Sequence, residues 1–293
     1  MPLATYMENN VNIKIFCRSF DLKLYRLSKG LYESFGFPCV RLTDQTADGY
    51  FHAILRDTSC DVAINVDEDC FITSREAVLS LVNYVLRHGY ANAGCQDGGG
   101  WCPRGGNPLV TNPFFNVLDL RILRKQYSLE AVRSFNYEAN KQSMQAGFPA
   151  ERLVEGRAFS FDKTDFEPYY PFFLWQACAT KTLYLRNERH PDGMTTILYN
   201  QDDEELCRHT WLARFYSTPA FIVRHWQPNA GAQQKRIDNV IAQAYAMQHL
   251  PVPAFTFRNR LEFVANKLVR WLIKIPQRII NWPNKLRKKL RKS

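Results

Sequence analysis

Two aspartates separated by one residue, Asp67 and Asp69, directly follow an apolar run, CDVAINV, that is typical of a buried strand. Two carboxylates at this spacing can both reach one hard cation, and Mg²⁺ in proteins is usually held by one or two carboxylates together with phosphate oxygens of a substrate. In open α/β sheets, ligands bind outside the carboxyl ends of the strands, which is where this acidic turn falls. The sequence therefore predicts a divalent cation and a diphosphate at Asp67 and Asp69.

Acidic turns are common on protein surfaces, and the alternative for these aspartates is a solvated turn without a ligand. Phosphatases of the haloacid dehalogenase type also carry two aspartates after a strand. They require a threonine four residues after the first aspartate, where this chain has Phe71. The apolar strand before the acids favours the metal site.

The elements before residue 90 alternate between strands and helices. Apolar and β-branched runs predict strands, and leucines at helical spacing predict helices, in the order strand 11–17, helix 21–35, strand 37–42, strand 60–66 and helix 74–89. The segment 49–55 fits either a strand or a helix. This alternation predicts an α/β domain over residues 1–255, with a mainly parallel sheet flanked by helices.

The chain beyond residue 90 is less regular. Five glycines within residues 98–106 must let this loop bend sharply or approach a ligand closely. We expect a strand on each side of the loop, followed by a helix at 127–147, a helix with acids at its front at 202–216, a strand at 218–226 and a helix at 232–249.

The positive charge is concentrated at the end of the chain. Residues 258–293 hold 12 of the 38 Lys and Arg residues but only one of the 28 Asp and Glu residues, so the rest of the chain has a net charge of −1. A nucleic-acid-binding domain spreads basic residues over its folded face. We therefore expect no nucleic acid as a partner.

The basic segment itself predicts an amphipathic helix that ends at Pro276, with Arg and Lys flanking an apolar face made of Leu261, Val264, Leu268, Trp271, Leu272 and Ile275. Such a helix is suited to lie in the interface of an anionic membrane. The alternatives are a helix that packs on the core with a solvated basic end, or a nucleic-acid-binding tail. We expect residues 256–293 to form a membrane-associating amphipathic helical tail.

The cysteines and the hydropathy indicate the compartment. The eight cysteines include no Cys-X-X-Cys pair, residues 1–20 do not read as a signal sequence, and no run approaches the roughly 20 apolar residues that cross a bilayer. We expect a cytoplasmic protein that is peripheral on the inner face of the plasma membrane.

The acidic turn AINVDEDCFI, with its strand-helix start and its later aromatic half, resembles the GT-A glycosyltransferases, particularly bacterial ones that build surface polysaccharides. The resemblance covers roughly residues 11–226. It implies a GT-A-like, Rossmann-related fold in which Mn²⁺ or Mg²⁺ binds the diphosphate of a nucleotide-sugar donor. It further implies Asp69 as the principal metal ligand and Asp67 as a ribose or metal contact. About 50 residues separate the first strand from the acids, fewer than is typical of these enzymes, so the nucleotide half must be compact.

The same resemblance implies contacts to the nucleotide and the metal elsewhere in the chain. Arg18 and Ser19 end the first strand against the nucleotide, and Asp44 after the second strand would contact the base. Arg214 would reach the diphosphate. Such enzymes often supply a late histidine to the metal, for which His209 is the candidate and His225 the alternative.

Three aspartates are candidates for the base that deprotonates the acceptor. The resemblance favours Asp202 or Asp203, just upstream of the expected late helix, although acids in a first helical turn also complement the helix dipole. Asp97, in the glycine-rich loop, would bind donor hydroxyls or act as the base. Its alternative role is to cap the glycine turn.

These expectations combine into a glycosyltransferase that moves a sugar from a nucleotide-sugar donor to a glycan or lipid-linked glycan acceptor. One alternative is a non-catalytic, membrane-bound scaffold of the same fold. Another is a sugar-nucleotide nucleotidyltransferase, which should carry a glycine-rich signature with a basic residue near its N-terminus. This chain has none there.

Overall fold

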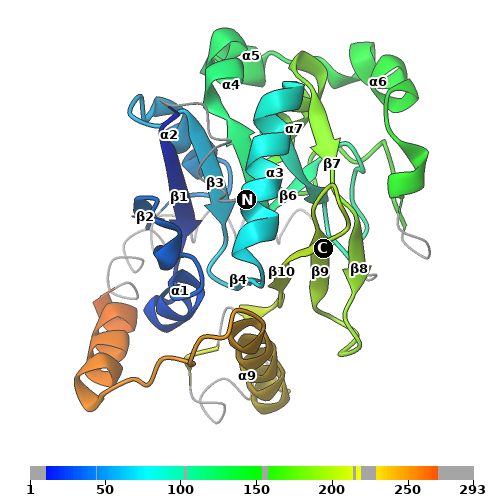
Figure 1. The fold of residues 1–293 in the computed structure, drawn as a ribbon. Helices are drawn as coiled ribbons and strands as arrows, with labels where there is room; N and C mark the ends of the chain where they lie inside the picture. Colours follow the sequence, from blue (N-terminus) through cyan, green and yellow to red (C-terminus); the bar gives the residue numbers. More distant parts are fainter. Residues whose placement is uncertain are drawn as a thin grey trace, which may run out of the picture.

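The computed structural model describes residues 11–43, 45–101, 104–153, 158–213, 216–218 and 229–269. Its central sheet has six strands in the order β2-β1-β3-β6-β5-β7 (Figure 1). The strands are β1 (Ile13–Arg18), β2 (Cys39–Leu42), β3 (Val62–Val66), β5 (Asn92–Gln96), β6 (Thr111–Asp119) and β7 (Thr182–Tyr184). β1 pairs in parallel with β2 and β3, and β5 with β7, whereas β6 runs antiparallel to β3 and β5. The α/β class and the mainly parallel sheet are therefore confirmed.

A second, antiparallel sheet of four strands has the order β4-β10-β9-β8. Its strands are β4 (Cys70–Ile72), β8 (Asn187–Arg189), β9 (Thr196–Tyr199) and β10 (Glu205–His209). β3 belongs to the first sheet and β4 to the second, and the acidic turn 67–69 joins them. The turn therefore lies at the junction of the two sheets, within reach of side chains from both.

Helices cover both faces of the central sheet. Their bounds are α1 (Leu22–Lys29), α2 (Gly49–Arg56), α3 (Arg75–His88), α4 (Leu120–Gln126), α5 (Leu129–Arg133), α6 (Tyr137–Ala146), α7 (Tyr170–Ala179) and α9 (Ala230–Met247), with short 3₁₀ turns at Glu33–Phe35 and Ala150–Arg152. Successive side chains of a strand point to opposite faces. In β1, Ile15 accordingly joins the apolar cluster of α1, α3 and α9, and Phe16 joins that of α2, α4 and α7.

The helix ends follow local chemistry. Asp21 caps α1 by accepting hydrogen bonds from the backbone N–H groups of Lys23 and Leu24, and Ser74 caps α3 in the same way. α3 ends at Gly89, whose φ of 66° suits a residue without a side chain. The helix predicted at 21–35 is shorter than expected, because α1 ends at Lys29 and a separate 3₁₀ turn follows.

The ambiguous segment 49–55 is helical, as α2. The helix predicted at 202–216 is wrong. Residues 200–204 form a tight turn, in which Asn200 Oδ1 accepts the backbone N–H groups of Asp202 and Glu204 at 2.9 Å each, and the chain then enters β10. β10 is paired on both sides, with β4 and β9, and this pairing fixes the extended conformation.

The tail is described as far as residue 269, and residues 257–269 are helical. In Figure 1 this helix, drawn in orange, lies near α1. Among the described residues, no helix has the length and apolar character that a bilayer crossing requires. The division of the chain at residue 255 stays a prediction.

Candidate metal and phosphate site

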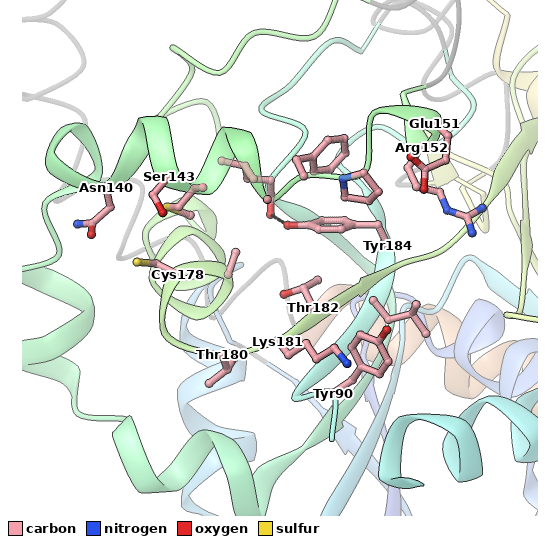
Figure 2. A pocket seen from close by; sticks show the side chains of 17 residues that line it. Tyr90, Asn140, Ser143, Glu151, Arg152, Cys178, Thr180, Lys181, Thr182 and Tyr184 are labelled. Carbon is pink, nitrogen blue, oxygen red and sulfur yellow. Dashed lines mark hydrogen bonds between the residues drawn. The ribbon is translucent and has the colours of Figure 1, made fainter. Parts of the chain in front are cut away.

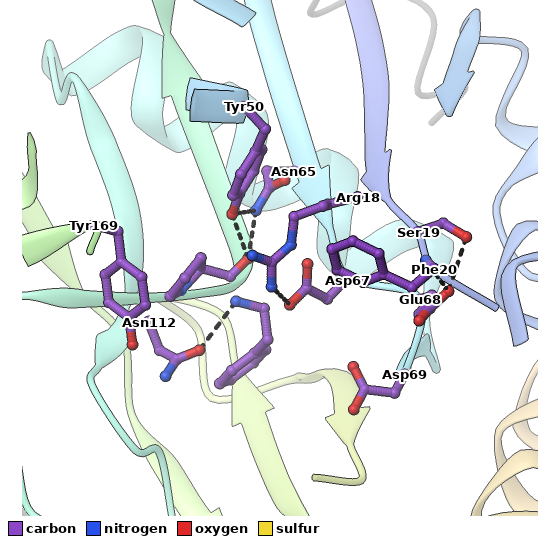
Figure 3. Close-up of polar contacts among 12 residues, drawn as sticks. Arg18, Ser19, Phe20, Tyr50, Asn65, Asp67, Glu68, Asp69, Asn112 and Tyr169 are labelled. Carbon is purple, nitrogen blue, oxygen red and sulfur yellow. Dashed lines mark hydrogen bonds and ion pairs between the residues drawn. The ribbon is translucent and has the colours of Figure 1, made fainter. Parts of the chain in front are cut away.

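The acidic turn follows the carboxyl end of β3, beside the carboxyl end of β1. Phe16 pairs with Asn65 in the parallel ladder, so that two residues further along each strand Arg18 lies next to Asp67. The backbone N–H of Asp67 donates to Phe114 O on β6 at 2.8 Å. Figure 3 shows Arg18 reaching Asp67, with Glu68 turned toward Ser19 and Phe20.

Asp67 is paired with Arg18. Arg18 Nη2 lies 3.3 Å from Asp67 Oδ2, and the guanidinium lies over the ring of Tyr50 at 5.1 Å. The other oxygen, Asp67 Oδ1, is buried and has no hydrogen-bond partner among the described residues. Burial raises the pKa of Asp67, against the opposing effect of Arg18. Asp67 therefore presents one satisfied oxygen and one that lacks a donor.

Asp69, just before β4, contacts His209 on the neighbouring strand β10. His209 pairs with Cys70 in the β4-β10 ladder, and Thr210 N–H donates to Asp69 O at 3.0 Å. This register places His209 Nε2 3.3 Å from Asp69 Oδ1. Burial raises the pKa of Asp69, but His209, a backbone hydrogen bond and Arg18 together lower it by more, so the net pKa is lowered.

Aromatic rings fix the orientation of His209. Its ring stacks on Phe114, with centroids 4.3 Å apart and an interplanar angle of 12°, and lies edge-on to Trp211 at 4.2 Å. Trp211 and Leu212, which follow closely, both have positive φ values, 55° and 54°. Such values in bulky residues are strained, and strain of this kind tends to occur at functional sites.

The Asp69–His209 pair fits two ligands of one metal ion. The contact has the same length as the ion pair of Arg18 with Asp67, 3.3 Å, so it is also compatible with a direct pair. Two ligand atoms each about 2.1 Å from an octahedral ion, at a right angle, lie about 3 Å apart. The described residues contain no cluster of three or more metal-ligating side chains. The structure thus places Asp69 against His209, whereas Asp67 is engaged by Arg18.

Glu68, for which the sequence suggested no role, holds the loop between β1 and α1. Glu68 Oε2 accepts the Ser19 hydroxyl at 2.8 Å and the backbone N–H groups of Phe20 and Asp21 at 2.9 and 2.7 Å. Ser19 is fully buried, and its hydroxyl also accepts from Arg41 Nε at 3.0 Å. Ser19, predicted to contact the nucleotide, is therefore engaged in supporting the acidic turn.

Glu68 makes stability depend on pH. Burial raises its pKa to about 8 from an ordinary value of 4.5, so between these values the folded state holds a proton that the unfolded state has lost. The free energy of unfolding should therefore fall as pH rises from about 4.5 to about 8. We expect the melting temperature of Glu68→Gln, which mimics the protonated acid, to fall less over this window than that of the wild type. If the melting temperatures of the wild type and Glu68→Gln fell in parallel with pH, this account would be contradicted. Glu151→Gln, at an exposed position, serves as the control.

Asp97 is enclosed. It has no exposed surface, and its carboxylate takes donors from four side chains, namely Asn112 at 2.6 Å, Tyr169 at 2.8 Å, Tyr170 at 2.7 Å and Arg104 at 3.3 Å. A general base needs an accessible lone pair within reach of its substrate. This arrangement argues against the predicted role of Asp97 as base or sugar ligand and assigns it to the fold. Gly106 packs so closely that an added Cβ would lie 2.8 Å from Asp97 Oδ2, which explains one of the loop glycines.

Asp202 and Asp203 do not join the site. They lie in the turn before β10, where Asp202 Oδ2 accepts from Ser80 at 3.2 Å and Asp203 pairs with Arg186 at 2.6 Å. His209 is at the other end of β10, and six residues of extended chain span about 20 Å. This distance argues against either acid as the base. Asp44, Arg214 and His225 lie outside the described residues, so their predicted roles stay predictions.

Arg104 is a cation near the site that the sequence did not single out. Its guanidinium lies 5.5 Å from the centroid of the Trp211 ring, and Trp211 also contacts His209. Arg104 Nη2 donates to Glu167 and to the hydroxyl of Tyr169, both at 2.8 Å. Sequence reasoning missed Arg104 because Glu167, Tyr169 and Trp211 are more than 60 residues away in the chain.

The chain also has a cavity of about 540 Å³ beside β7, between α6 and α7 (Figure 2). Its described lining includes Tyr90, Lys181 and Tyr184 and none of the predicted site residues. The acidic turn and this cavity are therefore separate features.

No protein-family model and no curated protein matches the sequence. Among solved structures, the crystal structure of A197 from STIV is similar over 67% of this chain and 93% of that chain, with a TM-score of 0.36 and 9% sequence identity. A likeness of this extent implies neither an activity nor site residues for this chain.

Proposed function

We propose that the protein is a metal-dependent glycosyltransferase of the GT-A type, which acts at the inner face of the plasma membrane. Its substrates would be a nucleotide-sugar donor and a glycan or lipid-linked glycan acceptor. The observation that carries the proposal is the approach of Asp69 Oδ1 to His209 Nε2, 3.3 Å, at the junction where β1 and β3 end. Ligands of open α/β sheets bind at this edge.

In this proposal Asp69 and His209 would hold Mn²⁺ or Mg²⁺. The ion, when bound, would neutralise the charge that develops on the departing nucleoside diphosphate. Arg18 provides a second positive charge at the same edge of the sheet, and its net pKa is raised by Asp67 despite burial, so it stays protonated. The side chain of Arg18 is 18% exposed, which leaves part of it open to a phosphate.

Arg18 pairs with one oxygen of Asp67, and the other oxygen remains for a ligand. Asp67 Oδ1 lacks a donor among the described residues, which favours a ligand, a cation or a ribose hydroxyl, at that oxygen. Asp97 is enclosed, and Asp202 and Asp203 lie at the far end of β10, so the proposal assigns no base for the acceptor.

Thermal shift with a panel of nucleotide sugars, each with and without Mn²⁺, tests the proposal. A donor at about 100 times its dissociation constant stabilises by about 2.7 kcal/mol, which raises the melting temperature by several degrees. We expect this shift for one donor class, only when Mn²⁺ is present, and its loss in His209→Gln. An equal shift without metal would contradict the site. A shift with nucleoside triphosphates and sugar phosphates instead would indicate a nucleotidyltransferase.

A further inference from the structure

The helix at 257–269 exposes an apolar face. Of the eleven large hydrophobic side chains that are exposed in the described part of the chain, five belong to these thirteen residues. Four of them recur at helical spacing along one face, namely Phe257 (76% exposed), Leu261 (55%), Val264 (57%) and Leu268 (57%). We name these four side chains the apolar face. An unpartnered row of this kind in water marks an interaction surface.

The opposite side of the same helix is attached to the body. Phe263 is 7% exposed and packs on Phe255, with ring centroids 5.0 Å apart. Lys267 Nζ donates to Thr218 Oγ1 at 2.6 Å and lies 3.4 Å from Asp21 Oδ2. Glu262 pairs with Arg26 of α1. The helix is therefore anchored, and its anchoring turns the apolar face outward.

The charge of the chain determines which partner fits this face. Arg258 and Arg260 are exposed beside the apolar face, and residues 270–293 add nine basic residues and no acidic one. The chain before residue 258 has a net charge of −1, which does not balance the charge of this tail. A surface that is apolar inside and anionic outside complements both features at once, and a lipid bilayer with anionic headgroups has this composition.

We infer that the apolar face docks into an anionic membrane surface, with Arg258 and Arg260 against the headgroups. The docked helix fixes the orientation of the acidic turn, because Lys267 contacts Asp21 and the backbone N–H of Asp21 donates to Glu68 Oε2 at 2.7 Å. The edge of the sheet that carries Asp67 and Asp69 is thus tied to the membrane-bound helix through α1. This inference stands whatever reaction the acidic turn supports.

Flotation of the full-length protein with vesicles of phosphatidylglycerol and phosphatidylcholine tests the inference. We expect the wild type to float and the triple variant Leu261→Glu, Val264→Glu and Leu268→Glu to lose at least about tenfold in partition, since each change removes apolar contact. The matched control carries the same three charges at exposed apolar positions elsewhere, Leu153→Glu, Met247→Glu and Val252→Glu. We expect the control to float like the wild type.

Four outcomes would overturn the inference. The first is that the wild type does not float, and the second is that the triple variant floats like the wild type. The third is that both variants lose flotation equally, which would show that net charge alone acts. The fourth is that the wild type is a dimer without vesicles and the triple variant is a monomer, which would assign the apolar face to a second copy of the chain. Circular dichroism of each variant checks its folding. We expect every variant to fold, because the substituted side chains are exposed.

Discussion

Asp69→Asn should reduce the metal-dependent release of nucleoside diphosphate from the donor by about 1000-fold and leave the protein folded. Asparagine keeps the size of the side chain but removes the charge that binds the cation beside His209. A metal ion contributes several kcal/mol to stabilising a leaving group, and about 4 kcal/mol corresponds to about 1000-fold in rate. The fold-reduction is measured as the turnover rate of the two proteins at saturating Mn²⁺, with the donor found by thermal shift.

Asp202→Asn is the matched control for this prediction. Asp202 lies in the turn before β10 and contacts Ser80. Its substitution should therefore reduce turnover far less than the substitution of Asp69. If Asp202→Asn abolished turnover and Asp69→Asn did not, the site would have to be moved to the other end of β10. If neither variant released product at the wild-type rate, Asp202 would have a catalytic role that its position does not explain.

Asp97→Ala should lower the free energy of unfolding by about 3 kcal/mol or more, because each buried donor left without an acceptor costs about 1–3 kcal/mol. The carboxylate has no exposed surface, and its loss would remove the acceptor of Asn112, Tyr169 and Tyr170, whereas Arg104 would keep its pair with Glu167. Urea unfolding, followed by tryptophan fluorescence, measures the change as a lower midpoint.

Asp203→Asn is the control for the Asp97 prediction, because asparagine tolerates the positive φ of 61° at this position. The Asp203 side chain is 69% exposed and pairs with Arg186, and exposed pairs contribute about 0–1 kcal/mol. Its unfolding midpoint should therefore stay close to that of the wild type. Should Asp97→Ala unfold like the wild type yet lose turnover, Asp97 would act in the chemistry, as the sequence had suggested, and the structural role would be wrong.

The sequence was informative where local pattern and long-range structure agree. The run CDVAINV is apolar on both faces because β3 is buried on both faces, and the acids come where the strand ends. Leucine spacing with a serine cap and a terminal glycine defined α3 to within a residue at each end. These signals are local, so a single sequence is sufficient to find them.

The failures had long-range causes. The acids at 202–205 suggested the first turn of a helix. In the structure Asn200 closes a tight turn there, and β10 then pairs with β4 on one side and β9 on the other. For Asp97 the sequence leaves a sugar ligand, a base or a cap of the glycine turn open, because its two tyrosine partners are more than 70 residues away in the chain. Glu68 had no predicted role, because its carboxylate binds a loop almost 50 residues earlier. None of these contacts has a signature in the local sequence.

Crystals of the protein grown with Mn²⁺ and a nucleoside diphosphate would test the central claim most directly, through an anomalous difference map at the manganese absorption edge. The account predicts one manganese peak about 2.1 Å from both Asp69 Oδ1 and His209 Nε2, with a diphosphate oxygen completing its coordination. A bound diphosphate with no manganese at these two atoms, or a manganese ion held by other residues, would contradict it.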